Sequence, residues 1–213
     1  MPLQNRVAPD GTIFATPARG LLMGNRGGQM HDGEKRLTKR RWVSRQWISC
    51  VLQYKDRHDT IMAPGRYTQL FFLDEATALA AGHRPCALCR RADFLRFMEH
   101  WQALRELSAR PKVAEVDRQL HQERFGDNRD KRTHSTQLVK LPPGVMISSA
   151  ADPQLYVGGR LLLWSPSGYG TPEKADGARS VDVLTPPSIV AILAAGYVPL
   201  LHPSARSMSA ARS

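Results

Sequence analysis

The spacing of apolar residues differs between parts of the chain, and each spacing indicates whether strands or helices lie there. Up to about residue 73, short stretches rich in β-branched and aromatic residues predict strands, one around Ile13 and others over residues 47–54, 60–63 and 69–73. From there to about residue 124, apolar residues recur at spacings of three and four, which predicts helices. The last third returns to strands joined by glycine and proline turns, and a helix within "SIVAILAAGYVPLL" follows them.

Local signals predict where the helices begin and end. Asp74 can cap a short helix over "EATALAA", and Gly82 stops it as a glycine just beyond a helix C-terminus does. A long helix is expected over residues 91–109, with Pro111 after it, and a shorter one is expected to end near residue 124. The apolar face of the long helix is formed by Phe94, Phe97, Met98, Trp101, Leu104 and Leu107.

These elements predict an α+β fold in which a β-α unit is followed by helices, a C-terminal antiparallel β region and a final short helix. The pair Gly158-Gly159 is a hairpin signal within the β region. We expect one compact domain over residues 1–203, with halves at 1–110 and 111–203, and a disordered tail over residues 204–213.

Two segments resemble each other weakly. "ATALAAGHRPCALC" and "IVAILAAGYVPLLHPS" each contain a helix, an AAG sequence, an aromatic ring, a variable residue and a proline. In both, glycine would stop a short helix and proline would fix the direction of the chain that follows. The similarity is compatible with an internal duplication over residues 74–89 and 189–202, or with chance.

Composition narrows the class of protein. The chain has 213 residues and no apolar run of membrane-spanning length, and its start lacks the pattern of a secretory signal, so a cytoplasmic location is expected. In that reducing compartment its three cysteines indicate a metal site or burial in preference to disulfides. Phosphate-loop, dinucleotide, GxSxG and HExxH motifs are all lacking.

Positive charge points to a polyanionic partner. Lys and Arg number 30 against 19 Asp and Glu, a net charge of +11, and nucleic acid is the commonest polyanion, DNA being favoured over RNA here. The residues expected to contact it lie in two basic segments: Lys39, Arg40, Arg41 and Trp42 in the first, and Arg84, Arg90 and Arg91 in the second.

Cys86 and Cys89 form a CxxC motif directly after the predicted helix stop. This spacing allows both thiolates to bind one ion, and zinc accepts sulfur and nitrogen ligands in a tetrahedral site. A thioredoxin-like redox pair would need a helix start immediately after a buried parallel strand, and here a helix, a glycine and a proline precede the motif. Two thiols without a special role remain the other alternative.

The segment "LFFLDEATALAAGHRPCALCRRADF" resembles part of the zinc-binding domain of Ada-type alkylation-response proteins. The resemblance covers about residues 69–94 and consists of a Phe-Phe strand, an alanine-rich helix, an AG-aromatic-RPC sequence and the second cysteine. It implies that Cys86 and Cys89 bind zinc, that residues 1–110 form an Ada-like half, and that the β-α unit is centred on zinc. More loosely, the whole chain resembles an uncharacterised family of bacterial proteins.

One feature of the Ada domain is missing. Its other two zinc ligands form a Cys-x-x-x-Cys pair upstream, and one of these thiolates accepts a methyl group from a DNA phosphotriester. Lys55 and Asp59 stand in that window here, which argues against methyl transfer. The remaining ligands are therefore expected among His31, at the end of a glycine-rich loop and next to Asp32, and Cys50, which could equally be a core cysteine. If Cys50 is a core residue, His58 is the alternative fourth ligand.

Three functions fit these observations. The first is a nucleic-acid-binding protein with a mainly structural zinc held by Cys86, Cys89, His31 and Cys50, acting in DNA repair or damage response. The second is a zinc enzyme with a metal-bound water and a carboxylate as base. The third is a metal-free protein-interaction module.

Overall fold

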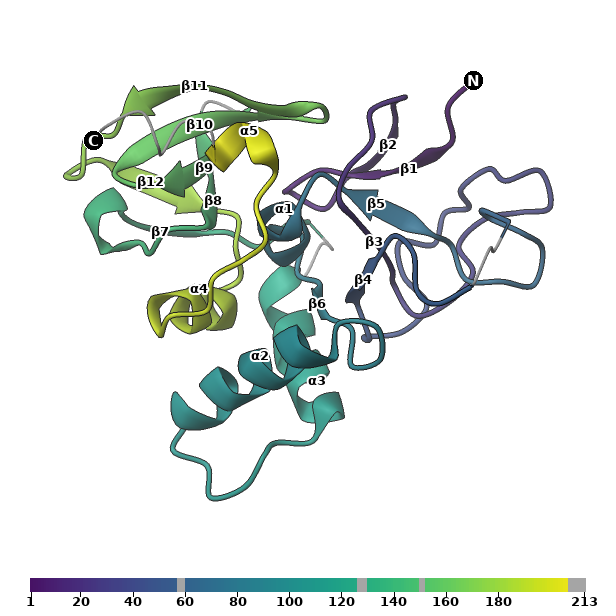
Figure 1. The fold of residues 1–213 in the computed structure, drawn as a ribbon, viewed down its shortest axis with the longest axis horizontal. Helices are drawn as coiled ribbons and strands as arrows, with labels where there is room; N and C mark the ends of the chain where they lie inside the picture. The colour runs from purple at the N-terminus through teal and green to yellow at the C-terminus, as the bar shows by residue number, and fades with distance from the viewer. Residues whose placement is uncertain (57–59, 126–129, 150–151, 207–213) are drawn as a thin grey trace.

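The computed structural model describes residues 1–56, 60–125, 130–149 and 152–206. These residues form two six-stranded sheets with a short helix between them and further helices below (Figure 1). The predicted α+β fold is therefore confirmed, including the C-terminal antiparallel sheet and the short final helix.

The first sheet has the strand order β2-β1-β5-β3-β4-β6. Its strands are β1 (Gln4–Val7), β2 (Ile13–Ala15), β3 (Leu22–Asn25), β4 (Ile48–Val51), β5 (Leu70–Phe72) and β6 (Arg84–Pro85). The pairs β1 with β5 and β4 with β6 are parallel, and the other neighbours are antiparallel. Because β6 pairs with β4, the chain just after β6 runs beside the end of β4.

The second sheet has the order β11-β10-β9-β8-β12-β7, and all its pairs are antiparallel. Its strands are β7 (His134–Gln137), β8 (Val145–Ser149), β9 (Asp152–Val157), β10 (Arg160–Ser165), β11 (Gly168–Lys174) and β12 (Ser180–Val183), with a 3-10 turn, η1 (Leu138–Lys140), after β7. Gly158 and Gly159 both have positive φ and join β9 to β10, so the hairpin predicted there is confirmed.

Helix α1 (Glu75–Ala80) lies between the two sheets, and all six of its residues are buried. Ala76 and Ala80 pack with the core of the second sheet, whereas Ala78 packs with the core of the first. Small side chains on both faces allow the two sheets to approach one helix closely, which explains the alanine-rich sequence. Asp74 caps α1 by accepting a hydrogen bond from the Thr77 amide, as expected.

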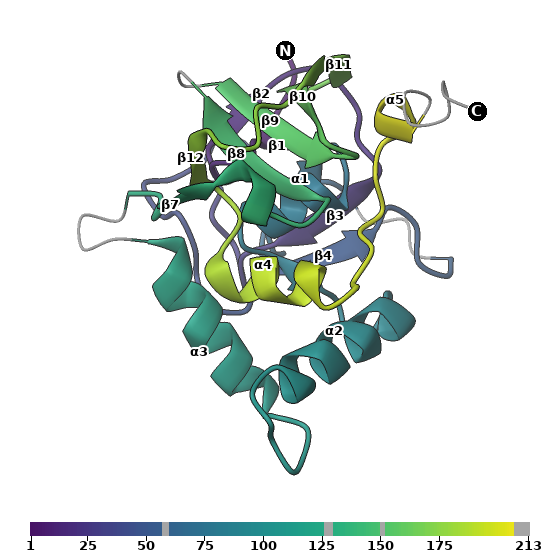
Figure 2. The same ribbon diagram turned by 90° about the vertical axis from the view of Figure 1, so that its left-hand side faces the viewer.

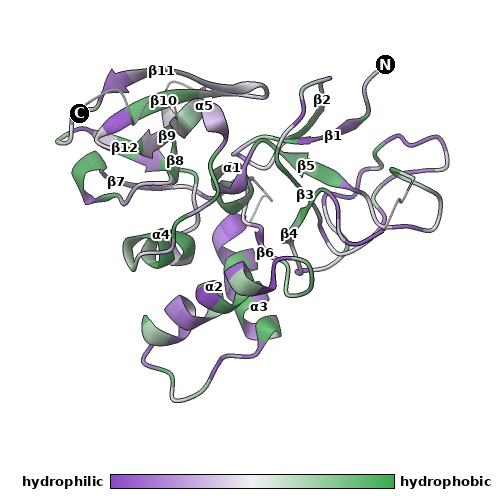
Figure 3. Cartoon of the chain, viewed as in Figure 1, coloured by the Kyte–Doolittle hydropathy of each residue, from purple (hydrophilic) through white to green (hydrophobic). Residues whose placement is uncertain are grey.

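The remaining helices are α2 (Arg91–Ala103), α3 (Val113–Arg124), α4 (Pro187–Ala194) and α5 (Pro203–Arg206). Figure 2 shows α4 between the second sheet and the pair formed by α2 and α3, and one large apolar cluster joins these elements. Hydrophilic and hydrophobic residues alternate along α2 and α3 (Figure 3), since each helix buries one face and exposes the other.

Several predicted boundaries were wrong. Residues 60–63 form a turn instead of a strand, because Met62 adopts a φ of 53° and donates its amide hydrogen to Gln69 Oε1. Helix α2 ends at Ala103 and not at residue 109, since Glu106 also has positive φ. The strands predicted over 47–54 and 69–73 are shorter, at 48–51 and 70–72.

Two residues counted in the apolar face of the long helix, Leu104 and Leu107, lie beyond its end and are exposed. The predicted disordered tail begins too early, because Ser204, Ala205 and Arg206 belong to α5 and Ala205 is buried. Residues 207–213 lie outside the described part of the chain.

The two similar segments share one local structure. In α1 the amides of Gly82 and His83 donate to the carbonyl oxygens of Leu79 and Ala78, and in α4 the amides of Gly196 and Tyr197 donate in the same way to Leu193 and Ile192. Both are Schellman C-caps with glycine at positive φ. The similarity is thus explained by a common helix-stop geometry, whether or not the segments are duplicated.

Candidate functional site

The pairing of β4 with β6 brings the three cysteines together. Cys50 lies on β4, Cys86 follows β6, and the Cys86 amide donates to the Ser49 carbonyl oxygen at 2.9 Å. Cys89 lies in the turn that leads into α2. The three sulfur atoms are within 4.8 Å of one another, and this is the group of potential metal ligands found among the described residues. Three nearby thiols of this kind could hold a metal ion.

The turn between Cys86 and Cys89 directs amide hydrogens at sulfur. The Leu88 amide donates to Cys86 Sγ at 3.4 Å, and the Arg90 amide donates to the Cys86 carbonyl oxygen at 3.2 Å. Amide donors stabilise a thiolate more than a thiol. This local geometry therefore favours sulfur in the form that binds metals.

The sulfurs also influence each other's protonation. Hydrogen bonds from Cys50 and Cys89 lower the pKa of Cys86 to about 2, against burial, which acts in the opposite direction. The bond to Cys86 raises the pKa of Cys50 far above its ordinary value, with a further contribution from the bond to Cys89. The hydrogen bond from Cys50 lowers the pKa of Cys89. The hydrogen bond to Cys86 and burial act in the opposite direction, and the pKa of Cys89 is raised overall. Three closely packed sulfurs can thus share one negative charge, but all three ionise only beside a cation.

A cavity of about 550 Å³ lies beside the three sulfurs and is lined by all three cysteines. One wall is the face of the first sheet that carries Met23, Ile48 and Phe71, opposite the face that packs on α1. Its polar lining consists of amides and phenols: Asn25, Gln53, Tyr54, Tyr67 and Gln69. Within the described residues, no carboxylate or imidazole lines this cavity.

His31 does not join the cysteines. Its Nδ1 lies 2.7 Å from Thr68 Oγ1 and its Nε2 lies 3.2 Å from the Ala63 carbonyl oxygen, so both ring nitrogens are engaged in holding the loop. Asp32, its neighbour in the sequence, forms an ion pair with Arg36. The expected ligand set of two cysteines, His31 and Cys50 is therefore reduced to its three sulfurs. His58 lies outside the described residues.

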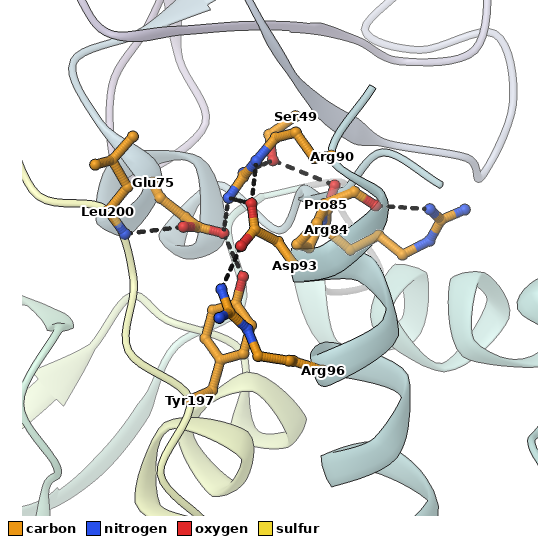
Figure 4. A network of polar contacts seen from close by, with 9 residues as sticks. All are labelled: Ser49, Glu75, Arg84, Pro85, Arg90, Asp93, Arg96, Tyr197 and Leu200. Atoms are coloured by element: carbon orange, nitrogen blue, oxygen red, sulfur yellow. Dashed lines mark hydrogen bonds and ion pairs between the residues drawn. The ribbon is translucent and has the colours of Figure 1, made fainter. Parts of the chain in front are cut away.

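Arg84 and Arg90 are buried in ion pairs, contrary to the expectation that they project toward phosphates. Arg84 binds both carboxylate oxygens of Asp117, at 2.8 and 2.9 Å. Arg90 contacts Glu75 and Asp93 at 2.8 Å each (Figure 4). Their side chains are 4% exposed. These arginines join the cysteine segment to α1, α2 and α3 instead of forming a basic surface.

The Arg90 network extends to the C-terminal segment. Glu75 accepts hydrogen bonds from the Tyr197 hydroxyl at 2.7 Å and the Leu200 amide at 2.9 Å (Figure 4). Desolvation by burial and the Glu75 carboxylate together raise the pKa of Tyr197. The sequence offered Glu75 as one possible base of a zinc enzyme but did not reveal this network, although a carboxylate in the first turn of an otherwise apolar helix is a signal for a buried partner.

The other residues expected to bind nucleic acid lie nearer the surface. Lys39, Arg40 and Arg41 are exposed in the loop between β3 and β4, and Arg91 is exposed at the start of α2. Trp42 is partly buried, and its ring is stacked on Phe125 with centroids 4.9 Å apart. One face of the Trp42 ring is thus already covered by the protein.

Comparison of the chain with family models, with curated proteins and with solved structures found no match. None of the described helices combines the length and apolar character needed to span a membrane. The local resemblance to the Ada domain therefore stays a prediction from the sequence.

Proposed function

We propose that this chain is a zinc protein that binds nucleic acid, with zinc held by Cys50, Cys86 and Cys89. The observation that carries the metal assignment is the convergence of three sulfurs, from β4 and from the turn before α2, within 4.8 Å. Zinc binds thiolates at about 2.3 Å in tetrahedral geometry, which separates neighbouring sulfurs by about 3.8 Å. The protein therefore holds three donors close to the required spacing.

The proposed role of the metal is mainly structural. The cysteines join β4 to the start of α2, two elements that contact each other little through apolar side chains. Zinc would neutralise the thiolates and fix the direction of α2, and its binding energy would add to the stability of the fold. Three thiolates leave the fourth position of a tetrahedral site to another ligand, and His58 lies outside the residues that the structure describes.

A hydrolytic zinc enzyme is less well supported. Such an enzyme needs a zinc-bound water and a nearby base, usually a carboxylate or a histidine. The described lining of the cavity offers amides and phenols instead. Three thiolates would also give the site a net negative charge, which weakens its ability to lower the pKa of bound water.

Metal substitution tests the assignment against a metal-free module. We expect purified protein to contain one zinc per chain and its cobalt form to show sulfur-to-cobalt charge-transfer absorption, because cobalt occupies tetrahedral thiolate sites. C50S, C86S and C89S should each weaken that absorption, whereas H31A should retain it. Wild-type protein that excludes both metals, or a spectrum unchanged by C50S, would contradict the proposal, even if C86S proved too unstable to measure.

Nucleic-acid binding is supported by charge. The net charge is +11, and Lys39, Arg40, Arg41 and Arg91 are exposed. Cations at the surface release counterions from the phosphate backbone, so affinity should depend steeply on salt. The resemblance to the Ada domain favours DNA and a role in repair or damage response, but methyl transfer is not part of the proposal.

A salt titration with matched variants tests this part. We expect K39A/R40A to bind single- and double-stranded DNA more weakly and to reduce the slope of log K against log salt by about one to two. The control is K140A/K174A, which removes two exposed lysines next to the second sheet and should leave the slope closer to that of the wild type. Binding that is insensitive to salt between roughly 50 and 200 mM would exclude this mode of recognition.

A further inference from the structure

Two buried arginines converge on the ring of Trp47, and a lysine lies near them. The guanidinium carbon of Arg26 lies 4.0 Å from the Trp47 ring centroid, and that of Arg124 lies 4.4 Å from it. Arg26 is 2% exposed and Arg124 is 1% exposed. Lys131 completes the group, since its ammonium donates to the buried Ala80 carbonyl oxygen at the end of α1.

The hydrogen-bond acceptors of this cation cluster (Arg26, Arg124 and Lys131) are mainly neutral carbonyls. Arg26 donates to Gly11 at 2.8 Å, and Arg124 donates to Gly82 at 2.8 Å and to Arg45 at 3.2 Å. Within the described residues, no carboxylate lies at ion-pair distance from any of the three. The cluster is therefore hydrogen-bonded without being neutralised.

The pKa shifts of the three cations also indicate that their charges are not neutralised. Burial, with repulsion from neighbouring arginines, lowers the pKa of Arg26 and of Arg124 to about 9, and burial with repulsion from Arg124 and Arg26 lowers the pKa of Lys131 to about 7. Asp10 acts in the opposite direction on Arg26 and Lys131, and Asp117 and Glu123 do so on Arg124. These carboxylates do not offset the cost of burial.

A buried histidine adjoins the cluster. Arg26 Nε donates to His83 Nε2 at 3.4 Å, and burial with the charges of Arg26 and Arg124 lowers the pKa of His83 well below its ordinary value. His83 Nδ1 and Arg124 Nη2 are buried, and neither has a hydrogen-bond partner among the described residues. Hydrogen-bonding capacity thus remains unused next to the uncompensated charge.

The cluster opens into a cavity of about 640 Å³. Its lining contains five cations, Arg26, Lys39, Arg40, Arg41 and Lys131. Two carboxylates, Asp10 and Asp130, also line it, and both are exposed; Asp10 is in addition bonded to Thr12. The described lining therefore carries a clear excess of positive charge.

A purely structural role accounts for part of this arrangement. Arg124 and Lys131 satisfy the carbonyls of Gly82 and Ala80 at the negative end of α1, where cations are favourable. That role needs one or two cations. It does not explain why Arg26 and three more cations from the loop before β4 face the same cavity.

We propose that this cavity binds a phosphate group, held between Arg26 and Lys131 on one side and the loop carrying Lys39, Arg40 and Arg41 on the other. A terminal phosphate carries a charge of about −1.5 to −2 near neutral pH and accepts several hydrogen bonds, and guanidinium and ammonium groups are its usual ligands in proteins. That the phosphate belongs to a nucleic acid rests on the proposed function; inorganic phosphate has the same chemistry.

The test uses Lys131, which is part-buried and lines the cavity. Wild-type protein, K131M and the exposed-lysine control K140M are titrated with inorganic phosphate against chloride at equal ionic strength, and binding is followed by calorimetry and by the thermal midpoint. We expect phosphate, but not chloride, to raise the midpoint of wild type and K140M, and K131M to bind at least about tenfold more weakly. K131M should fold, because methionine replaces an uncompensated charge with a similar volume.

A second comparison identifies the source of the phosphate. Oligonucleotides with a 5′-phosphate and with a 5′-hydroxyl are titrated into wild type and K131M, and a Lys131-dependent preference for the 5′-phosphate would assign the cavity to nucleic-acid ends. Phosphate binding without DNA binding would support the cavity and contradict the proposed function. DNA binding with neither phosphate dependence nor an effect of K131M would leave the proposed function intact and overturn the phosphate site.

Discussion

At the scale of single residues, burial decides which of the chemically interesting side chains can act. Cys50 could be read from the sequence as a core residue or as a ligand, and its strand places it beside Cys86 and Cys89. His31 had suitable chemistry, but its ring nitrogens are used by Thr68 and Ala63. Spacing in the sequence could not show that Cys50 joins the site and His31 does not. The distance of each residue from Cys86 and Cys89 depends on which strands pair, and these strands are far apart in the sequence.

Lys131 gives a test of buried charge at this scale. Burial and the neighbouring Arg124 and Arg26 lower its pKa from 10.5 to about 7, while Asp10 partly opposes them. Between these values the unfolded chain binds more protons at this residue than the folded chain, so this contribution makes the free energy of unfolding rise with pH, by up to about 1.4 kcal/mol per pH unit.

We therefore expect K131M to be stabilised most, relative to wild type, near pH 7, and the difference to shrink as pH rises toward 10. Urea unfolding at several pH values in phosphate-free buffer measures the difference in the free energy of unfolding between K131M and wild type. The exposed-lysine variant K140M should follow the wild-type curve. Parallel curves for K131M and wild type across this range would show that Lys131 is not held in an unfavourable charged state.

At the level of helices and strands, the periodic patterns predicted which elements exist better than they predicted where each element ends. Helices α1 and α3 and the Gly158-Gly159 hairpin lie where the sequence indicates. Errors occurred where one residue takes a left-handed conformation, at Met62 and Glu106, which no apolar pattern reveals. The basic residues also misled the prediction of a nucleic-acid surface, since Arg84 and Arg90 are paired with Asp117 and Glu75, carboxylates that lie far from them in the sequence.

The pairing of Arg84 with Asp117 shows how strongly one element depends on another. We expect D117A to lower the free energy of unfolding by about 3–5 kcal/mol, because it leaves a guanidinium buried without its partner. E115A, which removes an exposed carboxylate from the same helix, should cost less than about 1 kcal/mol. Urea unfolding of both variants decides this, and equal costs would mean that the buried pair does not tie α3 to β6.

At the scale of the whole molecule, two polar centres lie on different sides of the first sheet. The cysteines line a cavity on the face that carries Met23, Ile48 and Phe71, whereas the arginines of the cation cluster contact Trp47 and its lysine binds the end of α1. The chain between β3 and β4 connects them, because it carries Lys39, Arg40 and Arg41 and continues into the strand of Cys50. A metal that fixes β4 and β6 would thereby also support the basic loop.

The central claim is that three thiolates of one chain hold one zinc ion. X-ray absorption at the zinc edge of purified protein measures the ligands directly. We expect three sulfur neighbours at about 2.3 Å and one lighter neighbour, nitrogen or oxygen, and two sulfur neighbours in C50S. Protein without zinc, or a zinc ion with fewer than three sulfur neighbours in the wild type, would contradict the account.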